Sequence, residues 1–356
     1  MNDERLRQLI RQDVQGMHAY AVQDSAGLIK LDAMENPHRL PPELRRQLGE
    51  RLAEVALNRY PGDRVADLRR ALAAHAGMPE GFALMLGNGS DELISLLAMA
   101  CDVPGASILA PKPGFVMYEM SAQLQGLKFI GVDLTPDFEL DEAAMLAAIE
   151  EHRPSIIYLA YPNNPTANLW DDAVIEKIIE AAPGLVVIDE AYQPFSSRSY
   201  AGRMARHRHV LLMRTMSKFG LAGVRIGYMI GPRELIAEID KVRPPYNISV
   251  LNCECALFAL GHQDEFARQA QDIRNQRMVI QTVLKALPGV TSWPSDANMI
   301  LVRVPDAGRT FDGMKARGVL VKNVSKMHPL LANCLRLTVG TAEENERMLA
   351  ALQASL

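Results

Sequence analysis

Cysteine, aromatic residues and long apolar runs are all scarce in this sequence. Its four cysteines, Cys101, Cys253, Cys255 and Cys334, show no Cys-x-x-Cys spacing, so we predict neither a disulfide framework nor a metal site. Unpaired thiols suit the reducing cytoplasm, where we expect the protein to reside. The longest apolar runs fall far short of a membrane span, and residues 1–15 are too highly charged for a signal peptide.

Blocks of a single charge sign are also missing. The 38 lysines and arginines and the 42 acidic residues are scattered along the chain and give a formal net charge of −4. We therefore expect no nucleic-acid partner. A length of 356 residues is too great for one ordinary small core and suits two lobes.

Short apolar runs alternate with amphipathic stretches through most of the chain. This alternation predicts an α/β fold with a mostly parallel sheet and helices on both faces. Beyond Pro232 the pattern changes to helices, among them a long charged helix over about 264–287, and then to a small α/β lobe. The predicted strands cover 82–86, 107–110, 128–132, 155–160, 185–189, 210–214 and 225–230, followed by 299–304, 319–322 and 334–339.

Two residues at predicted strand ends carry the strongest chemical signal. Lys218 follows the strand 210–214, and Asp189 ends the strand 185–189. The simplest interpretations are a solvated loop lysine and a helix-capping or ion-paired acid. Together, however, they supply an amine for a Schiff base and a carboxylate that keeps a pyridine nitrogen protonated, which are requirements of pyridoxal phosphate (PLP). Ligands collect at the carboxyl ends of such strands.

A second group of residues suits the phosphate of the same cofactor. The turn Gly87-Asn88-Gly89-Ser90-Asp91 follows a predicted strand and opens a predicted helix, so its free N–H groups favour an anion. Taken alone, Ser90 as an ordinary N-cap would explain this turn about as well. Ser217 and Arg225 lie on either side of Lys218 and would add ligands to the phosphate.

Polar side chains for the phenolic oxygen of PLP come from two further positions. Asn164 lies between Pro162 and Pro165, in a segment that is typical of a turn and that would also fix the direction of its amide. Tyr192 stands three residues after Asp189 and could donate to the same oxygen. Each feature alone is weak, but their joint occurrence in this order predicts a PLP site.

These motifs carry a resemblance. With Thr215-Met216-Ser217-Lys218, Asp189-Glu190-Ala191-Tyr192 and Asn163-Asn164-Pro165-Thr166, the chain resembles the fold-type I PLP-dependent aminotransferases nearly end to end. With Asp32-Ala33-Met34-Glu35-Asn36-Pro37 and Ala297-Asn298-Met299-Ile300, it most resembles the histidinol-phosphate aminotransferases among them. The resemblance implies a large domain with a mostly parallel seven-stranded sheet flanked by helices, plus a smaller α/β domain. It places the N-terminal arm with part of the small domain at 1–45, the large PLP-binding domain at 46–260 and the small C-terminal domain at 261–356.

The resemblance also implies a role for each site residue. Lys218, Asp189 and Tyr192 would be catalytic, with Phe115 stacked on the cofactor. Tyr60 would reach the cofactor phosphate of a neighbouring subunit, which implies a homodimer with shared sites. Arg336 would bind the carboxylate of the amino or keto acid. The full sets implied are Lys218, Ser90, Asp91, Phe115, Asn164, Asp189, Tyr192, Ser217, Arg225 and Tyr60 for the cofactor, and Tyr20, Asn36, Arg336 and Lys322 for the substrate.

The sequence departs from the family pattern at a few positions. Ala167 replaces the usual glycine after the Asn-Pro-Thr motif, Phe115 replaces the commoner tyrosine, and Met34 replaces a polar residue. Lys322 stands where some relatives have arginine, so bidentate geometry is lost there. None of these changes removes a catalytic group, so they bear on the details of the expected substrate and not on the cofactor.

The activity implied by the resemblance is transamination of L-histidinol phosphate with 2-oxoglutarate, which gives imidazole acetol phosphate and glutamate in histidine biosynthesis. Three alternatives stay open. An aromatic or broad-specificity amino-acid aminotransferase would use the same machinery, and a phosphoamino-acid decarboxylase would release CO₂ without a keto acid. The third is a non-catalytic regulator or structural homologue of this fold; a regulator would need a DNA-binding domain, for which residues 1–30 are too short.

Overall fold

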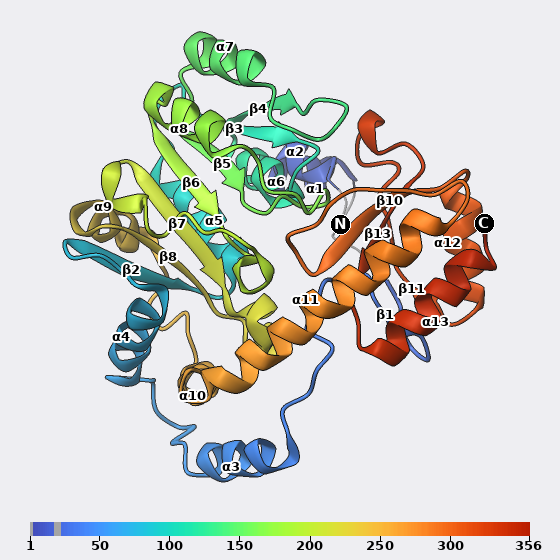
Figure 1. The fold of residues 1–356 in the computed structure, drawn as a ribbon. Helices are drawn as coiled ribbons and strands as arrows, with labels where there is room; N and C mark the ends of the chain where they lie inside the picture. Colours follow the sequence, from blue (N-terminus) through green and yellow to red (C-terminus); the bar gives the residue numbers. More distant parts are fainter. Residues whose placement is uncertain (1–2, 18–22) are drawn as a thin grey trace.

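The computed structural model describes residues 3–17 and 23–356, which are built around a seven-stranded sheet (Figure 1). The strand order is β2-β8-β7-β6-β5-β3-β4. Strand β8 is antiparallel to both of its neighbours, and all other neighbouring pairs are parallel. The predicted mostly parallel sheet is therefore confirmed. The strands are β2 (Phe82–Gly87), β3 (Ser107–Lys112), β4 (Lys128–Asp133), β5 (Ile156–Ala160), β6 (Leu185–Asp189), β7 (Val210–Thr215) and β8 (Gly227–Pro232).

Helices cover both faces of this sheet because its strands are apolar on both sides. On β5, Ile157 and Leu159 belong to one hydrophobic core, whereas Ile156 and Tyr158 belong to the other. This alternation follows from the two-residue period of a strand. The first core also takes side chains from α4 (Arg64–Ala76), α7 (Glu142–His152), α8 (Asp172–Ala181) and α10 (Val250–Leu260), and the second from α5 (Ser90–Ala100), α6 (Val116–Gln125) and α9 (Arg233–Ile239).

A smaller lobe surrounds a four-stranded sheet of order β12-β13-β10-β9. Its elements are β9 (Thr291–Ser292), β10 (Met299–Arg303), β12 (Lys322–Asn323) and β13 (Cys334–Thr338), with α12 (Ala307–Ala316) and α13 (Ala342–Gln353). The N-terminal arm joins this lobe, since β1 (Ile29–Lys30) pairs in parallel with β11 (Val319–Leu320).

The predicted strand 225–230 is displaced by two residues, since β8 spans Gly227–Pro232, and the predicted strand 319–322 is wrong in its extent. The apolar run 319–322 was expected to be continuous, but β11 pairs with β1 while β12 pairs with β13 in a different sheet. The chain changes sheets at Val321, which is fully buried. The run is divided because β1, in the distant N-terminal arm, pairs with residues 319–320 only. The local sequence pattern gives no sign of this pairing.

The predicted long charged helix is α11 (Gln263–Ala286), and it links the two lobes (Figure 1). Near its start Phe266 is buried in a core of the large sheet, whereas Ile273, Ile280 and Leu284 are buried in the core of the small lobe. Helix α3 (Pro42–Ala53) begins with Pro42, whose fixed φ suits the first turn of a helix. Two short helices, α1 (Asp3–Leu9) and α2 (Gln12–Gln15), precede it. The predicted domain boundaries at 45/46 and 260/261 stay a prediction.

Candidate active site

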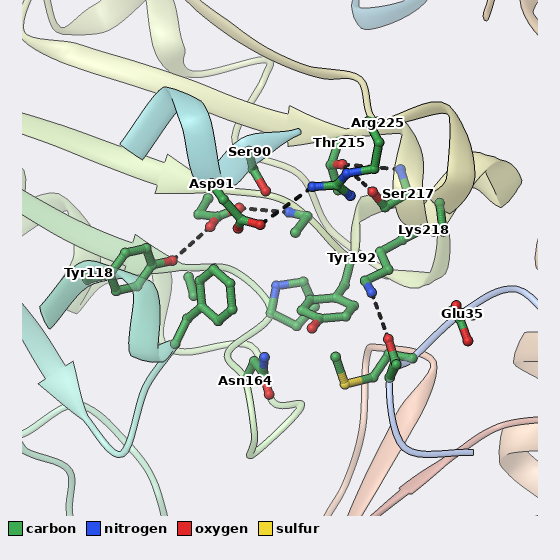
Figure 2. A pocket seen from close by; sticks show the side chains of 18 of the residues that line it. Glu35, Ser90, Asp91, Tyr118, Asn164, Tyr192, Thr215, Ser217, Lys218 and Arg225 are labelled. Atoms are coloured by element: carbon green, nitrogen blue, oxygen red, sulfur yellow. Dashed lines mark hydrogen bonds and ion pairs between the residues drawn. The ribbon is translucent and has the colours of Figure 1, made fainter. Parts of the chain in front are cut away.

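A cavity of about 350 Å³ lies at the carboxyl ends of the parallel strands (Figure 2). Figure 2 shows Ser90, Ser217 and Arg225 grouped on one side of it and Asn164 on the other, with the side chain of Lys218 extending toward the space between them. The structure thus brings together most of the predicted site. The predicted residues that line this cavity are Ser90, Asp91, Phe115, Asn164, Asp189, Tyr192, Ser217, Lys218 and Arg225.

The phosphate side of the cavity depends on two glycines. Gly89 has φ of +82°, and a Cβ there would lie 2.5 Å from a guanidinium nitrogen of Arg225. A Cβ at Gly227 on β8 would lie 2.6 Å from the backbone nitrogen of Ser90. Both positions therefore require glycine. The close approach places the Arg225 side chain beside the N-terminus of α5, where free N–H groups and a cation favour a phosphate dianion.

Lys218 lies in the tight turn Ser217–Leu221 directly after β7. Its Nζ donates a hydrogen bond to the backbone oxygen of Ala33 at 3.0 Å and lies 5.8 Å from the ring centroid of Tyr192. Burial, reinforced by the positive charge of Arg336, lowers the pKa of Lys218 to about 8. A lysine amine must be neutral to attack a carbonyl carbon, so this shift favours nucleophilic chemistry near neutral pH.

Asp189 ends β6 and is only 4% exposed. Its Oδ2 accepts a hydrogen bond from the hydroxyl of Tyr118 at 2.8 Å, and its Oδ1 accepts one from the backbone N–H of Ala191 at 3.0 Å. Burial raises the pKa of Asp189 to about 6, although the bond from Tyr118 opposes the shift. A carboxylate held in this way is suited to a protonated ring nitrogen.

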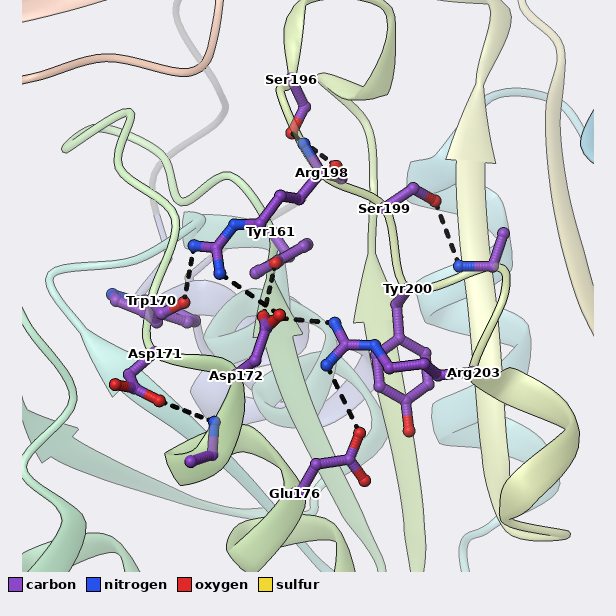
Figure 3. A network of polar contacts seen from close by, with 12 residues as sticks. Tyr161, Trp170, Asp171, Asp172, Glu176, Ser196, Arg198, Ser199, Tyr200 and Arg203 are labelled. Carbon is purple, nitrogen blue, oxygen red and sulfur yellow. Dashed lines mark hydrogen bonds and ion pairs between the residues drawn. The ribbon is translucent and has the colours of Figure 1, made fainter.

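Arg336 connects the small lobe to this cavity. It lies on β13, is 7% exposed, and donates to Oδ1 of Asn164 at 2.7 Å and to the backbone oxygen of Asp32 at 2.7 Å. Asn164 lies three residues after Tyr161, which belongs to a polar network (Figure 3). The hydroxyl of Tyr161 donates to Asp172 at 2.6 Å, and Asp172 pairs with Arg203 at 3.2 Å.

A second cavity of about 560 Å³ adjoins the first, because Met34, Phe115 and Asn164 line both. Arg336 and Lys322 line it, as expected of residues that bind anionic substrates. The side chain of Lys30 lines it as well, but its ammonium forms ion pairs with Glu35 at 2.5 Å and Asp32 at 3.4 Å.

Two predicted residues do not line these cavities, and a third is not described. Asn36 donates to the side-chain oxygen of Gln269 on α11 at 3.0 Å, and it lines neither cavity. Tyr60 is 72% exposed and lines a separate hollow of about 360 Å³. Tyr20 lies outside the described residues, so its predicted contact with the substrate stays a prediction.

Tyr118 and Thr215 are lining residues that sequence reasoning missed. Tyr118 stands three residues after Phe115, and helical spacing brings such positions to the same face, so the position of Phe115 could have indicated it. Thr215 begins the motif that contains Lys218, and its hydroxyl oxygen accepts from the backbone N–H of Ser217 at 3.1 Å. It orients the turn that carries Ser217.

The arrangement fits PLP. Its aldehyde needs an amine, which Lys218 supplies, and its ring nitrogen needs a carboxylate, which Asp189 supplies. Its phosphate needs a cation and free N–H groups. Gly89 and Gly227 provide these by allowing Arg225 to lie close to the start of α5. Such a site, at the carboxyl edge of an open α/β sheet, defines a PLP-dependent transferase of fold-type I.

Comparison with known proteins agrees with this class. Residues 26–352 match the family described as "Aminotransferase class I and II". The chain is 76% identical to a histidinol-phosphate aminotransferase of Polaromonas naphthalenivorans, over 99% of this chain and 98% of the relative. It is 71% identical to one from Methylibium petroleiphilum, over 99% and 96%. A solved histidinol-phosphate aminotransferase of Sinorhizobium meliloti in complex with pyridoxal-5'-phosphate has a TM-score of 0.85 at 24% identity, over 97% of this chain and 96% of that one.

The chain therefore belongs to the class I and II aminotransferase family. It is an aminotransferase with PLP as cofactor and small molecules as substrates, and the fold expected from the sequence is confirmed. Within the described residues, no helix is long and apolar enough to cross a membrane.

Proposed function

We propose that this enzyme transfers the amino group of L-histidinol phosphate to 2-oxoglutarate, giving imidazole acetol phosphate and glutamate in histidine biosynthesis. The observation that carries the proposal is the 76% and 71% identity, over nearly the whole chain, to relatives named histidinol-phosphate aminotransferase. Arg336 and Lys322 in the lining of the second cavity support the proposal, because both substrates carry anionic groups.

Lys218 is the group that moves protons. PLP, when bound, withdraws electrons from the substrate carbon that bears the amino group. We propose that the amine of Lys218 would remove the proton from that carbon as a general base and would then return a proton as a general acid. Its lowered pKa of about 8 suits both halves of this task, since the amine must exist in its neutral and charged forms near neutral pH.

Asp189, Tyr192 and Asn164 would hold the cofactor ring. Asp189 would keep the ring nitrogen protonated, while Tyr192 and Asn164 would bind the phenolic oxygen. Ser90, Ser217 and Arg225 would bind the phosphate, with Asp91 oriented by its ion pair to Arg225 at 3.6 Å. Phe115 would pack against the ring.

Two different anions must occupy one substrate site. Histidinol phosphate carries a phosphate and no carboxylate, whereas 2-oxoglutarate carries two carboxylates. Arg336 is our candidate for the group nearer the cofactor because it also contacts Asn164. Lys322 is our candidate for the distal anion, and its single ammonium can accept either a phosphate or a carboxylate without the fixed geometry of a guanidinium.

We further propose a homodimer with shared sites. Tyr60 stacks on Tyr246 with ring centroids 3.9 Å apart, and both rings are more than half exposed. Leu57 and Leu251 are also exposed. Exposed apolar side chains of this kind favour burial against another surface, and they include the tyrosine that would reach the partner's cofactor. We propose the cytoplasm as the compartment, since all four cysteines are free thiols.

The test is optical. The enzyme is purified with PLP, L-histidinol phosphate is added without a keto acid, and the visible absorbance band of the bound cofactor is followed. We expect the band to disappear and to return when 2-oxoglutarate is added. Loss of the band with phenylalanine but not with histidinol phosphate would favour an aromatic aminotransferase, and CO₂ release would favour a decarboxylase. Lys218→Ala should show no turnover and an unchanged fold.

A further inference from the structure

Tyr118 makes a contact inside the site that the proposed roles leave unexplained. It lies on α6 and is 2% exposed, and its hydroxyl donates to Oδ2 of Asp189 at 2.8 Å. Its ring stacks on Tyr158 with centroids 4.3 Å apart and meets Phe115 edge to face at 5.6 Å. The packing therefore fixes the direction of the hydroxyl as well as its position.

This hydrogen bond acts on a carboxylate whose surroundings oppose its charge. Burial disfavours the anion of Asp189, and the negative charges of Asp91 and Glu190 add to the effect. Glu190 is itself paired with Arg214 at 2.8 Å, and Asp91 with Arg225 at 3.6 Å. Two donors oppose protonation of Asp189: the Tyr118 hydroxyl and the backbone N–H of Ala191. Of these two, the hydroxyl can be removed by a substitution that leaves the backbone unchanged.

We propose that Tyr118 is a positioning residue that keeps Asp189 ionised and oriented, so that the carboxylate binds the protonated ring nitrogen of PLP. Tyr118 acts through Asp189 and takes no part in the reaction itself. A charge-assisted bond to a buried carboxylate is among the stronger hydrogen bonds of a protein interior. The inference rests on the role proposed above for Asp189, and is independent of the identity of the amino donor.

The neighbouring Tyr158 provides a matched control. It lies on β5 in the same stacked pair and is fully buried, but its hydroxyl has no hydrogen-bond partner among the residues that the structure describes. Tyr118→Phe and Tyr158→Phe thus remove the same atom from the two rings of one stack. Only the first change removes a bond to Asp189.

The test compares PLP with its 1-deaza analogue, in which a C–H group replaces the ring nitrogen. Dissociation constants of both are measured with the apoprotein of the wild type and of each variant. We expect the wild type to prefer PLP. Tyr118→Phe should weaken PLP binding about tenfold and leave the analogue unaffected, since losing a hydrogen bond to a charged group has roughly this effect. Tyr158→Phe should bind both as the wild type does.

Other outcomes would overturn the inference. Equal weakening of both cofactors in Tyr118→Phe would mean that the hydroxyl only supports packing, and unchanged binding of both would mean that it has no role. A wild type that binds PLP and the analogue equally would instead overturn the proposed role of Asp189. If Tyr118→Phe does not fold, 3-fluorotyrosine at position 118, a more acidic donor of nearly the same shape, should increase the preference for PLP; an unchanged preference would refute the proposal.

Discussion

At the scale of single residues, burial acts on two groups in opposite directions. It lowers the pKa of Lys218 to about 8 and raises the pKa of Asp189 to about 6, because in both cases the low-dielectric surroundings disfavour the charged form. Lys218 thereby gains a neutral, nucleophilic amine near neutral pH. Asp189 would lose the charge it needs, and the hydrogen bonds from Tyr118 and Ala191 oppose that loss.

The shift of Lys218 predicts how fast the protein captures PLP at different pH values. Only the neutral amine attacks the aldehyde, so the rate should rise with pH and level off above about 8, well below the ordinary lysine value of 10.5. Stopped-flow absorbance of the apoprotein mixed with PLP measures this rate, with N-acetyl-lysine amide as the unperturbed control. A rate that still rises tenfold per pH unit between 9 and 10 would contradict the shifted amine.

At the scale of elements, strands next to the site were the most predictable features. The ends of β6 and β7 agree with the sequence to within one residue, because buried strands of a parallel sheet are short apolar runs bounded by polar residues. The division of the run 319–322 between β11 and β12 was not predictable, since it depends on pairing with β1 across almost the whole chain. The pattern also missed the two-residue strands β1 and β9.

A single backbone angle explains why glycine is usual at one position where this chain departs from the family pattern. Ala167, where glycine is usual, has φ of +65° and is fully buried. The left-handed conformation costs an L-residue roughly 1–2 kcal/mol, whereas glycine would lose about 0.5–1 kcal/mol of entropy and about 0.8 kcal/mol from a missing methyl group. These effects nearly cancel. Ala167→Gly should therefore change the free energy of unfolding by no more than about 0.5 kcal/mol.

Urea unfolding measures this change, and a control comes from α13. Ala350 is an exposed residue in the interior of that helix, so Ala350→Gly should destabilise the protein by about 1 kcal/mol. A larger loss at the buried Ala167 than at the exposed Ala350 would show that its left-handed conformation carries no strain.

A substitution in the polar network around Asp172 should have a larger effect on the free energy of unfolding. Asp172 is the first residue of α8, accepts from the Tyr161 hydroxyl and pairs with Arg198 and Arg203, each at 3.2 Å (Figure 3). Asp172→Ala leaves a buried hydroxyl without its acceptor, so we expect a loss of about 2 kcal/mol in the free energy of unfolding. Because the network anchors the segment that leads to Asn164, PLP affinity should fall as well.

Glu142 provides the control for Asp172. It is also the first residue of its helix, α7, but its ion pair with Lys177 is exposed. Glu142→Ala should therefore lower the free energy of unfolding by about 0.5 kcal/mol and leave PLP affinity unchanged. Equal losses in the two variants would show that the contacts of Asp172 add nothing beyond its place at a helix start.

At the scale of the whole molecule, the site joins three distant parts of the chain. Lys218 bonds to Ala33 across 185 positions, and Arg336 bonds to Asp32 across 304. Residues carried by continuous motifs at strand ends, such as Asp189 and Ser217, could be found in the sequence because the sheet topology brings those ends together. Contacts between lobes, such as those of the N-terminal arm, could not, since they depend on how α11 places the small lobe against the large one.

Shared sites in a homodimer would extend this assembly to a second chain, and mixing two inactive variants tests the idea. Lys218→Ala lacks the catalytic amine, and Tyr60→Ala lacks the exposed tyrosine proposed to reach the partner's cofactor.

If the tyrosine acts across the interface, a hybrid dimer contains one site with both Lys218 and Tyr60. With random exchange, half of the dimers are hybrids with one intact site each, so activity should recover to about one quarter of the wild-type value. If Tyr60 acted within its own subunit, each site of the hybrid would lack one residue and no activity above that of the separate variants would return. The two variants are refolded together. As the control, they are refolded separately and then mixed under conditions in which the subunits do not exchange. Recovery of activity in the control would mean that contact between intact dimers suffices and that Tyr60 has no role inside the dimer.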